Sequence, residues 1–181
     1  MSQNIYNKII EALLRSENHI RGLAKLINTN QTSIARKVND LSKNNVVDFR
    51  QQGKNKVVFL KRSLEAKQSA YQVESQKLIE TVRKYPSLRR VIEAIKQNNK
   101  ISLAILFGSY AKGIARKDSD IDVYIETGDN GLKEEIQGID SRISVKIGMY
   151  NKDSILIKEI EKNHVIIKGV ELYYEKNKFF D

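Results

Sequence analysis

The sequence predicts an α+β protein in which a basic, mainly helical N-terminal third precedes a C-terminal region of alternating strands and helices. Two observations carry this prediction. Apolar residues recur at helical spacing through most of residues 1–62. Later in the chain, apolar runs of strand length are separated by segments with a helical pattern. The 181 residues suffice for one domain or for two small ones.

The N-terminal third predicts three helices and a hairpin. The expected elements lie at 4–16, 19–27, 31–43, 46–50 and 56–60. In the third helix, Ile34, Val38 and Leu41 share one face, which predicts that this face is buried. Asn30 can cap this helix, because its side chain accepts hydrogen bonds from the N–H groups of the first turn. A polar, glycine-containing loop joins the two strands.

The remaining chain divides into a helical connector and a second domain. A mostly polar helix is expected over 64–84, and Pro86 begins another that ends near Gln97, since proline is tolerated in a first turn. Further strands are expected at 101–107, 120–126 and 143–150, and further helices near 130–138 and 153–162. Val170–Tyr174 fits either a strand or a helix. The predicted domains are therefore 1–62, 63–98 and 99–181.

Composition excludes several kinds of chemistry. The chain has no cysteine, which removes disulfides, cysteine nucleophiles and thiolate zinc sites. Its two histidines, His19 and His164, are too few for a histidine-rich metal site. No apolar run approaches the roughly 18–20 residues needed to span a bilayer. The N-terminus lacks the apolar core of a signal peptide, so we expect a cytoplasmic protein.

Positive charge is concentrated in the first third of the chain. The formal net charge is +10, and residues 1–62 carry 12 Lys and Arg against 4 Asp and Glu. Residues 99–181 are nearly balanced, with 13 basic and 14 acidic side chains. A basic module of this size favours a nucleic-acid partner, because phosphate contacts release counterions. A solvated, lysine-rich surface accounts for the charge equally well.

Residues 19–60 resemble the winged helix-turn-helix family. The order is a short helix at Ile20–Ile27, a turn, a helix through Gln31–Leu41 and a hairpin wing. The resemblance implies that this last helix is the recognition helix and that the module binds double-stranded DNA. The expected DNA-binding residues are Gln31, Thr32, Ser33, Arg36, Lys37, Lys54 and Lys56. The alternative is a winged helix that only binds protein or dimerises.

The most informative motif lies in the C-terminal domain. An apolar strand ends at Phe107, and Gly108-Ser109 turns the chain into a short helix. Glycine lets a phosphate approach the backbone closely, and helix N-terminal amides favour an anion. Asp120 and Asp122 lie two apart on the next strand, so their carboxylates share one face. Adjacent carboxylates repel one another unless a cation lies between them, and such oxygen ligands suit Mg²⁺ bound with substrate phosphates.

A Gly-Ser pair followed, ten residues later, by Asp-Ile-Asp resembles the signature of the polymerase-β-like nucleotidyltransferase superfamily, and of minimal nucleotidyltransferases above all. The resemblance implies transfer of a nucleoside monophosphate from an NTP to an acceptor hydroxyl. Asp120 and Asp122 would hold Mg²⁺, and Gly108 and Ser109 would hold the triphosphate. Lys112 stands where the family often has arginine, so it is expected to contact phosphate or to lie on the surface. The alternative interpretation is a glycine turn beside a solvated acidic strand that binds nothing. It does not explain why an apolar strand, a Gly-Ser turn and paired aspartates follow one another in this order.

One position departs from the family pattern. The family places a third carboxylate on a later strand, and the matching strand here presents Ser144 and Lys146 on the expected face. Asp140 and Asp153 lie outside that strand. A lysine there would partly neutralise the aspartate pair, which favours nucleotide binding without full two-metal chemistry.

Two hypotheses follow. The first is an enzyme that modifies a protein or nucleic-acid acceptor located by the winged helix. The resemblance adds a small helical toxin-like protein as a candidate acceptor. The second is a DNA-binding regulator, or an antitoxin-like protein, with a degenerate domain that binds nucleotide. A homodimer is compatible with both. Tyr173-Tyr174 and Phe179-Phe180 are expected in the core or at an interface.

Overall fold

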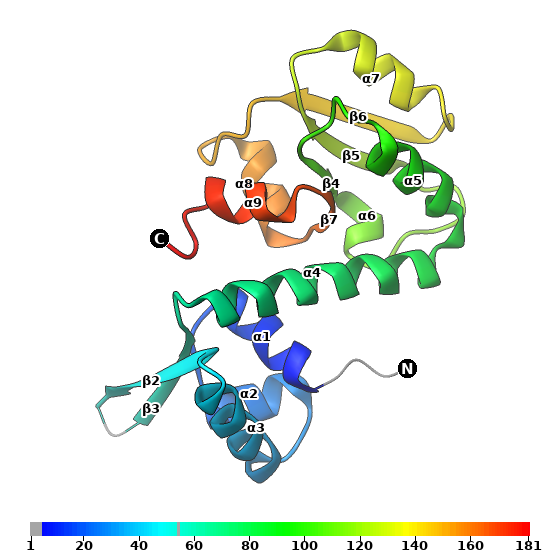
Figure 1. Cartoon of the computed structure of the whole chain (residues 1–181). Coiled ribbons are helices and arrows are strands. Elements are labelled where there is room, and N and C mark those ends of the chain that lie inside the picture. Colours follow the sequence, from blue (N-terminus) through cyan, green and yellow to red (C-terminus); the bar gives the residue numbers. More distant parts are fainter. Residues whose placement is uncertain (1–4, 54) are drawn as a thin grey trace. The chain divides into compact units, whose positions relative to one another are not determined.

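The computed structural model describes residues 5–53 and 55–181, which form two units (Figure 1). The first runs as far as Val73 and includes Phe180 and Asp181, and the second comprises Glu74–Phe179. The boundary falls inside helix α4, which spans Leu64–Lys84 as the sequence predicts. None of the described helices is long and apolar enough to cross a membrane.

Three helices build the first unit: α1 (Ile5–Arg15), α2 (Ile20–Ile27) and α3 (Gln31–Lys43). Helix α2 ends at Asn28, which adopts the left-handed conformation that asparagine tolerates. The Asn30 side chain accepts a hydrogen bond from the backbone N–H of Ser33 at 2.7 Å and so caps α3. The predicted bounds of α3 are confirmed.

A three-stranded antiparallel sheet completes this unit. It comprises β1 (Asn18–His19), β2 (Val47–Gln52) and β3 (Asn55–Leu60), in the order β1-β3-β2. The β2–β3 hairpin projects beyond the helices (cyan in Figure 1). Both hairpin strands extend further into the polar loop than predicted, because cross-strand backbone bonding continues through Gln51 and Gln52. Strand β1 was not predicted, since two polar residues carry no strand pattern.

The core of the first unit combines its helices and its hairpin. Ile34, Val38 and Leu41 of α3 are all buried, as the helical spacing predicts. They pack in one cluster with residues of α1, α2 and β3, among them Ile9 and Val58. Three helices followed by a two-stranded wing form the winged helix-turn-helix arrangement, so this part of the predicted fold class is confirmed.

The second unit begins with the C-terminal half of α4. Pro86–Leu88 forms a 3₁₀ turn, and α5 follows at Arg89–Gln97. A proline in the first turn loses no hydrogen bond that a helix would make there. The helix predicted from Pro86 to Gln97 therefore exists, but its first turn is wound more tightly than an α-helix.

A four-stranded mixed sheet forms the centre of the second unit. Its strands are β4 (Ala104–Leu106), β5 (Ile121–Glu126), β6 (Ile143–Gly148) and β7 (Val165–Lys168), in the order β6-β5-β4-β7. Only β5 and β6 run parallel. Strand β7 pairs with β4 and was missed by the sequence reasoning, because its four residues offer too short a pattern.

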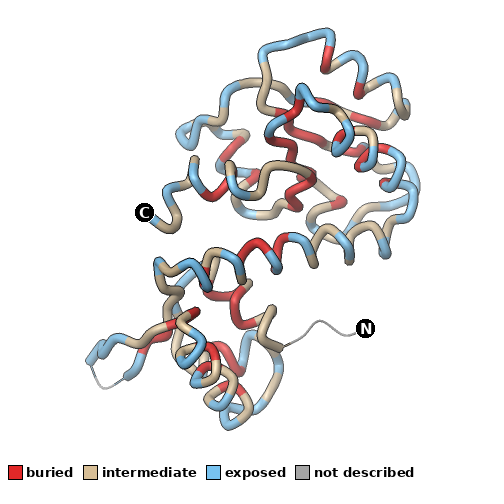
Figure 2. The backbone as a smooth tube through the Cα atoms, in the orientation of Figure 1, coloured by how far each residue is buried: buried red, intermediate tan, exposed pale blue. Residues whose placement is uncertain are grey.

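Four further helices connect or cover these strands: α6 (Gly108–Ala111), α7 (Asn130–Gln137), α8 (Ile155–Lys162) and α9 (Val170–Lys176). The ambiguous segment Val170–Tyr174 is thus helical. Apolar residues of α5 and α7 pack on the face of β5 that carries Ile121, Val123 and Ile125. Buried backbone, red in Figure 2, follows this sheet. The opposite face of β5 carries Asp122 and the buried Tyr124.

Candidate active site

Gly108 packs directly against the carboxylate of Asp122. Gly108 opens α6 with φ +68°, in the left-handed region that favours glycine. A Cβ atom at Gly108 would overlap Oδ2 of Asp122. The backbone N–H of Phe107, the preceding residue, donates to the carbonyl oxygen of Asp122 at 3.0 Å. The glycine turn and the acidic strand therefore form one tightly packed unit, brought together by the antiparallel pairing of β4 and β5.

Asp120 and Asp122 carry the charge of this site. Asp120 is exposed immediately before β5, and Asp122 is half-buried on the strand. Burial raises the pKa of Asp122, the charge of Asp120 raises that pKa further, and Lys146 lowers it. Two adjacent carboxylates, one of them with a raised pKa, are a donor set that a hard divalent cation would stabilise. The chemistry of these donors fits Mg²⁺.

The neighbouring strand supplies no carboxylate at this place. Ser144 on β6 pairs with Asp122, and Lys146 pairs with Tyr124, so both lie on the face of Asp122. This is the placement that the sequence predicts for Ser144 and Lys146. Within the described ranges, no three His, Cys, Asp or Glu side chains are grouped to hold a metal ion.

Two other acids near the sheet have partners of their own. Asp140 accepts two hydrogen bonds from the Arg142 guanidinium, at 3.1 and 2.8 Å, and this pairing lowers the pKa of Asp140 to about 2. Glu126, further along β5, forms an ion pair with Lys176 at 2.9 Å. Asp153 is exposed before α8. These contacts commit Asp140 and Glu126 to structural roles.

Lys112 lies at the end of α6 and contacts an acid that sequence reasoning did not single out. Its Nζ atom is 3.0 Å from Oε1 of Glu159 on α8. Both side chains are partly exposed, so the pair is worth little in stability and can exchange partners. Ser109, at the start of α6, is half-buried. No pattern in the sequence indicates the Lys112–Glu159 pair, because 47 positions separate the two residues.

The predicted DNA-binding residues lie on α3 and the hairpin. Gln31, Thr32, Arg36 and Lys56 are exposed, whereas Ser33 and Lys37 are half-buried. The Lys37 ammonium lies 4.3 Å from the centre of the Tyr6 ring, and that of Lys56 lies 4.9 Å from the centre of the Phe49 ring. Lys54 lies outside the described residues.

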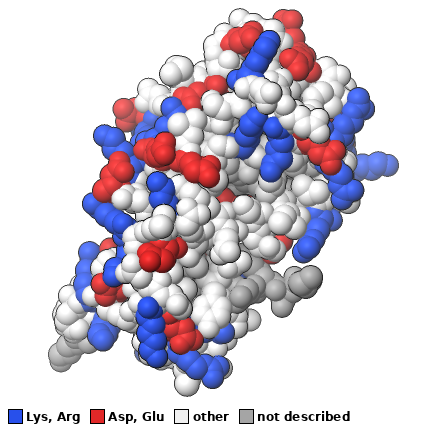
Figure 3. Space-filling view, in the orientation of Figure 1, with Lys and Arg blue, Asp and Glu red and all other residues white. Residues whose placement is uncertain are grey.

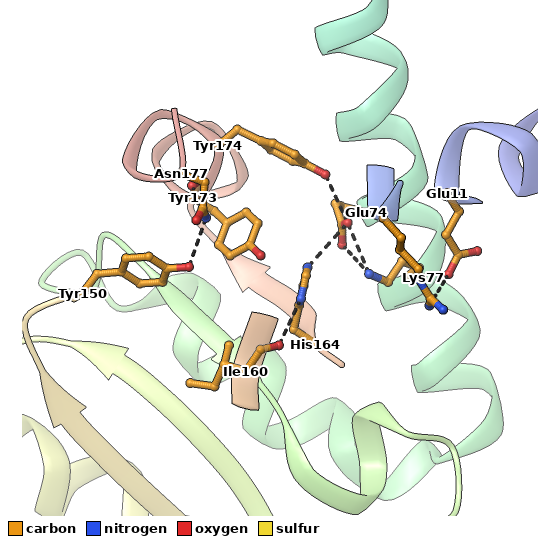
Figure 4. A network of polar contacts seen from close by, with 10 residues as sticks. Glu11, Glu74, Lys77, Tyr150, Ile160, His164, Tyr173, Tyr174 and Asn177 are labelled. Atoms are coloured by element: carbon orange, nitrogen blue, oxygen red, sulfur yellow. Dashed lines mark hydrogen bonds and ion pairs between the residues drawn. The ribbon is translucent and has the colours of Figure 1, made fainter. Parts of the chain in front are cut away.

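A second polar cluster, which includes neither Asp120 nor Asp122, surrounds a buried glutamate (Figure 4). Glu74 on α4 is 4% exposed and accepts hydrogen bonds from Lys77 at 2.9 Å and from the Tyr174 hydroxyl at 3.3 Å. Nε2 of His164 lies 3.7 Å from Oε1 of Glu74, and the His164 ring packs on Tyr173. His164 and the two tyrosines therefore belong to the interior, as predicted for Tyr173-Tyr174.

Comparisons with known proteins place the C-terminal domain. Residues 89–178 match the family described as Polymerase beta, Nucleotidyltransferase. A candidate protein adenylyltransferase of Methanocaldococcus jannaschii is 29% identical over 82 residues, which cover 42% of this chain and 82% of that protein.

Solved structures with lower similarity were also found. Reduced HlyU from Vibrio cholerae is 18% identical and covers 44% of this chain and 79% of its own, with a TM-score of 0.37. A toxin–antitoxin structure with AMP-PNP is 24% identical and covers 56% of this chain and 81% of its own, with a TM-score of 0.34.

The family match coincides with the unit that carries Gly108 and the aspartate pair. Residues 89–178 are therefore a nucleotidyltransferase domain of the polymerase β family.

Proposed function

We propose that this protein transfers a nucleoside monophosphate from an NTP to an acceptor hydroxyl. The observation that carries the proposal is the contact between the Gly108 backbone and the Asp122 carboxylate, with Asp120 two residues away. Here a phosphate held at the start of α6 would lie beside two carboxylates. The family match over residues 89–178 supports this assignment.

Each residue of the site has a role in this proposal. Asp120 and Asp122 hold Mg²⁺, which when bound neutralises the charge of the triphosphate and of the leaving pyrophosphate. Gly108 presents its backbone to the triphosphate, and Ser109 adds a hydroxyl donor. Lys112 leaves Glu159 and contacts a phosphate. In the reaction, the acceptor oxygen bonds to the α-phosphorus, the bond to pyrophosphate breaks, and the acceptor's proton passes to solvent.

For the acceptor and the nucleotide, we propose a protein hydroxyl and ATP. The support is the name of the Methanocaldococcus jannaschii relative, a candidate protein adenylyltransferase. A small helical toxin-like protein is a candidate acceptor on the resemblance to minimal nucleotidyltransferases. The winged helix would bind double-stranded DNA through α3 and the hairpin, as a monomer or as a homodimer on two half-sites.

The experiment uses the full chain, each α-labelled NTP, Mg²⁺ or Mn²⁺, and an extract of the source cells. The wild type should transfer label to a protein band, most efficiently from ATP, and Asp120→Ala/Asp122→Ala should not. Asp118→Ala is the matched control, because Asp118 is an exposed acid in the same loop, two residues before Asp120. Transfer by the double variant, or no transfer by the wild type, contradicts the proposal.

A second candidate function is favoured by Lys146. This lysine faces the aspartate pair where an acid would help to ligate a second metal, and its charge lowers the pKa of Asp122. The protein would then be a DNA-binding regulator, or an antitoxin-like protein, whose degenerate domain binds nucleotide. NTP binding by calorimetry without label transfer would select this function.

A further inference from the structure

A basic groove lies in the second unit, apart from the residues of the candidate active site. It has a volume of about 670 Å³ and is lined by the C-terminal end of α4, α6 and the loop before β5. Four cationic side chains line it: Lys84, Arg116, Lys117 and Arg142. Its lining includes neither Gly108 and Ser109 nor the aspartate pair. A volume of this order accommodates a nucleotide-sized ligand.

Two of these cations are fixed and two are available. Arg142 is held by Asp140 and also donates from Nη1 to the Lys117 carbonyl at 3.1 Å. Nζ of Lys84 donates to the Gly113 carbonyl at 2.7 Å. Arg116 and Lys117 are exposed, and no carboxylate pairs with either side chain among residues 5–53 and 55–181. In Figure 3, basic side chains gather along the edge of this unit near the C-terminal end of α4.

Two tyrosines line the groove together with the cations. The rings of Tyr85 and Tyr110 meet edge to face, with centroids 4.9 Å apart. The Tyr85 hydroxyl is buried and has no hydrogen-bond partner among the described residues. Tyr85 is half-buried and Tyr110 is 3% exposed, so Tyr85 supplies the aromatic surface of the groove.

We propose that this groove binds a single-stranded nucleic acid. Proteins that bind single strands combine a cationic groove along the phosphates with aromatic side chains against the bases. Here the groove combines four cationic side chains with one half-buried aromatic ring, that of Tyr85. Arginine suits phosphate because its planar guanidinium donates two parallel hydrogen bonds. An acidic peptide would use the cations and leave the aromatic surface without a role. The proposal does not rest on the transferase reaction.

The groove is joined to the candidate active site by one loop. The backbone N–H of Arg116 donates to the Ser119 hydroxyl at 2.8 Å, and that of Ile121 donates to the Arg142 carbonyl at 2.8 Å. Asp120 lies between Ser119 and Ile121. A strand in the groove would therefore contact the residues that position Asp120.

The test measures binding of a fluorescein-labelled strand of ten thymidines by fluorescence anisotropy, with neither NTP nor divalent cation. All proteins carry Arg36→Ala/Lys37→Ala, so that the winged helix contributes little. Arg116→Ala/Lys117→Ala should weaken binding at least tenfold at 50 mM salt. It should also reduce the slope of log K against log salt by about 1.4, since each phosphate contact contributes roughly 0.7 for single strands.

The matched control is Lys96→Ala/Lys100→Ala, which removes the same charge from exposed positions outside the groove. Binding by this control should stay within twofold. An equal loss in both double variants overturns the proposal. So does displacement of the strand by ten linked glutamates as effectively as by unlabelled strand, or binding of labelled AMP without binding of the strand. Because the assay lacks NTP and metal, its failure is separate from failure of the transfer assay.

Discussion

The hydroxyl of Tyr174 on α9 donates a hydrogen bond to Oε1 of Glu74 on α4 at 3.3 Å, across 100 positions of sequence. Glu74 is 4% exposed and is the one charged residue that is fully buried among the described positions. Lys77 and His164 approach the same carboxylate. This cluster joins the C-terminal helix of the second unit to the helix that begins it.

Loss of the Glu74 carboxylate should destabilise the protein. We expect Glu74→Ala to lower the free energy of unfolding by about 2–4 kcal/mol, because removing one member of a buried ion pair leaves its partners uncompensated. Tyr174→Phe should cost only about 1 kcal/mol, since it removes one hydrogen bond. Urea unfolding measures both, and an equal loss in the two variants would contradict this ranking.

The same carboxylate should make the protein sensitive to acid. Burial on its own raises the pKa of Glu74, but His164 and Lys77 outweigh it and lower the pKa to about 2. A carboxyl group with a lowered pKa stabilises the fold above its unfolded pKa and loses that contribution as pH falls. The stability difference between wild type and Glu74→Gln should therefore be full at pH 6 and shrink from about pH 4.5 to 2. A stability difference between the two proteins that does not change with pH would contradict this role of Glu74.

Gly108 should tolerate no side chain. We expect Gly108→Ala to cost about 2–4 kcal/mol, because it combines a positive φ with a Cβ that overlaps the Asp122 carboxylate. Gly53→Ala is the matched control, since Gly53 has φ +60° and nothing within 4 Å of a Cβ. Its cost should be about 1 kcal/mol. Thermal unfolding compares the two, and equal losses would show that the contact with Asp122 does not matter.

The aspartate pair should bind the metal ligand without stabilising the metal-free protein. Asp120→Asn removes the charge that raises the pKa of Asp122, so without metal the variant should be at least as stable as wild type. It should lose the thermal stabilisation by Mg²⁺ with a non-hydrolysable ATP analogue, and its transfer rate should fall at least about 100-fold. Stabilisation equal to wild type would exclude Asp120 as a ligand.

The winged helix should bind DNA through α3. Arg36→Ala should weaken duplex binding and reduce the salt slope by about 0.9 if Arg36 contacts a phosphate. If Arg36 contacts a base, the loss should instead depend on sequence and amount to about 1–3 kcal/mol. Lys158→Ala is the control, because Lys158 is exposed on α8 of the transferase unit. Duplex binding unchanged in Arg36→Ala would remove this residue from the interface.

Local sequence patterns were sufficient to predict the long helices and the motif that contains Gly108 and the aspartate pair. Helices α3 and α4 have the predicted bounds, because their apolar spacing and flanking residues act within one or two turns. Gly108 and the aspartate pair could be singled out as a candidate site because a phosphate site would need those residue types close together in sequence. Strands β1 and β7 were not predicted, because such short strands are stabilised by pairing with other strands rather than by their own sequence. Their partners β3 and β4 lie about 40 and 60 residues away.

The sequence by itself determined the order of the longer helices and strands, the winged helix and the glycine turn of the candidate site, since each depends on neighbours in the chain. Only the tertiary structure decided that Lys112 pairs with Glu159, that Asp140 is committed to Arg142, and that Glu74 is buried. Only the fold gathered Lys84, Arg116 and Arg142 into one groove. Contacts between residues that are tens of positions apart depend on how whole helices and strands pack. Because the packing free energy is distributed over the whole core, the two residues in contact carry no sequence signal of their own.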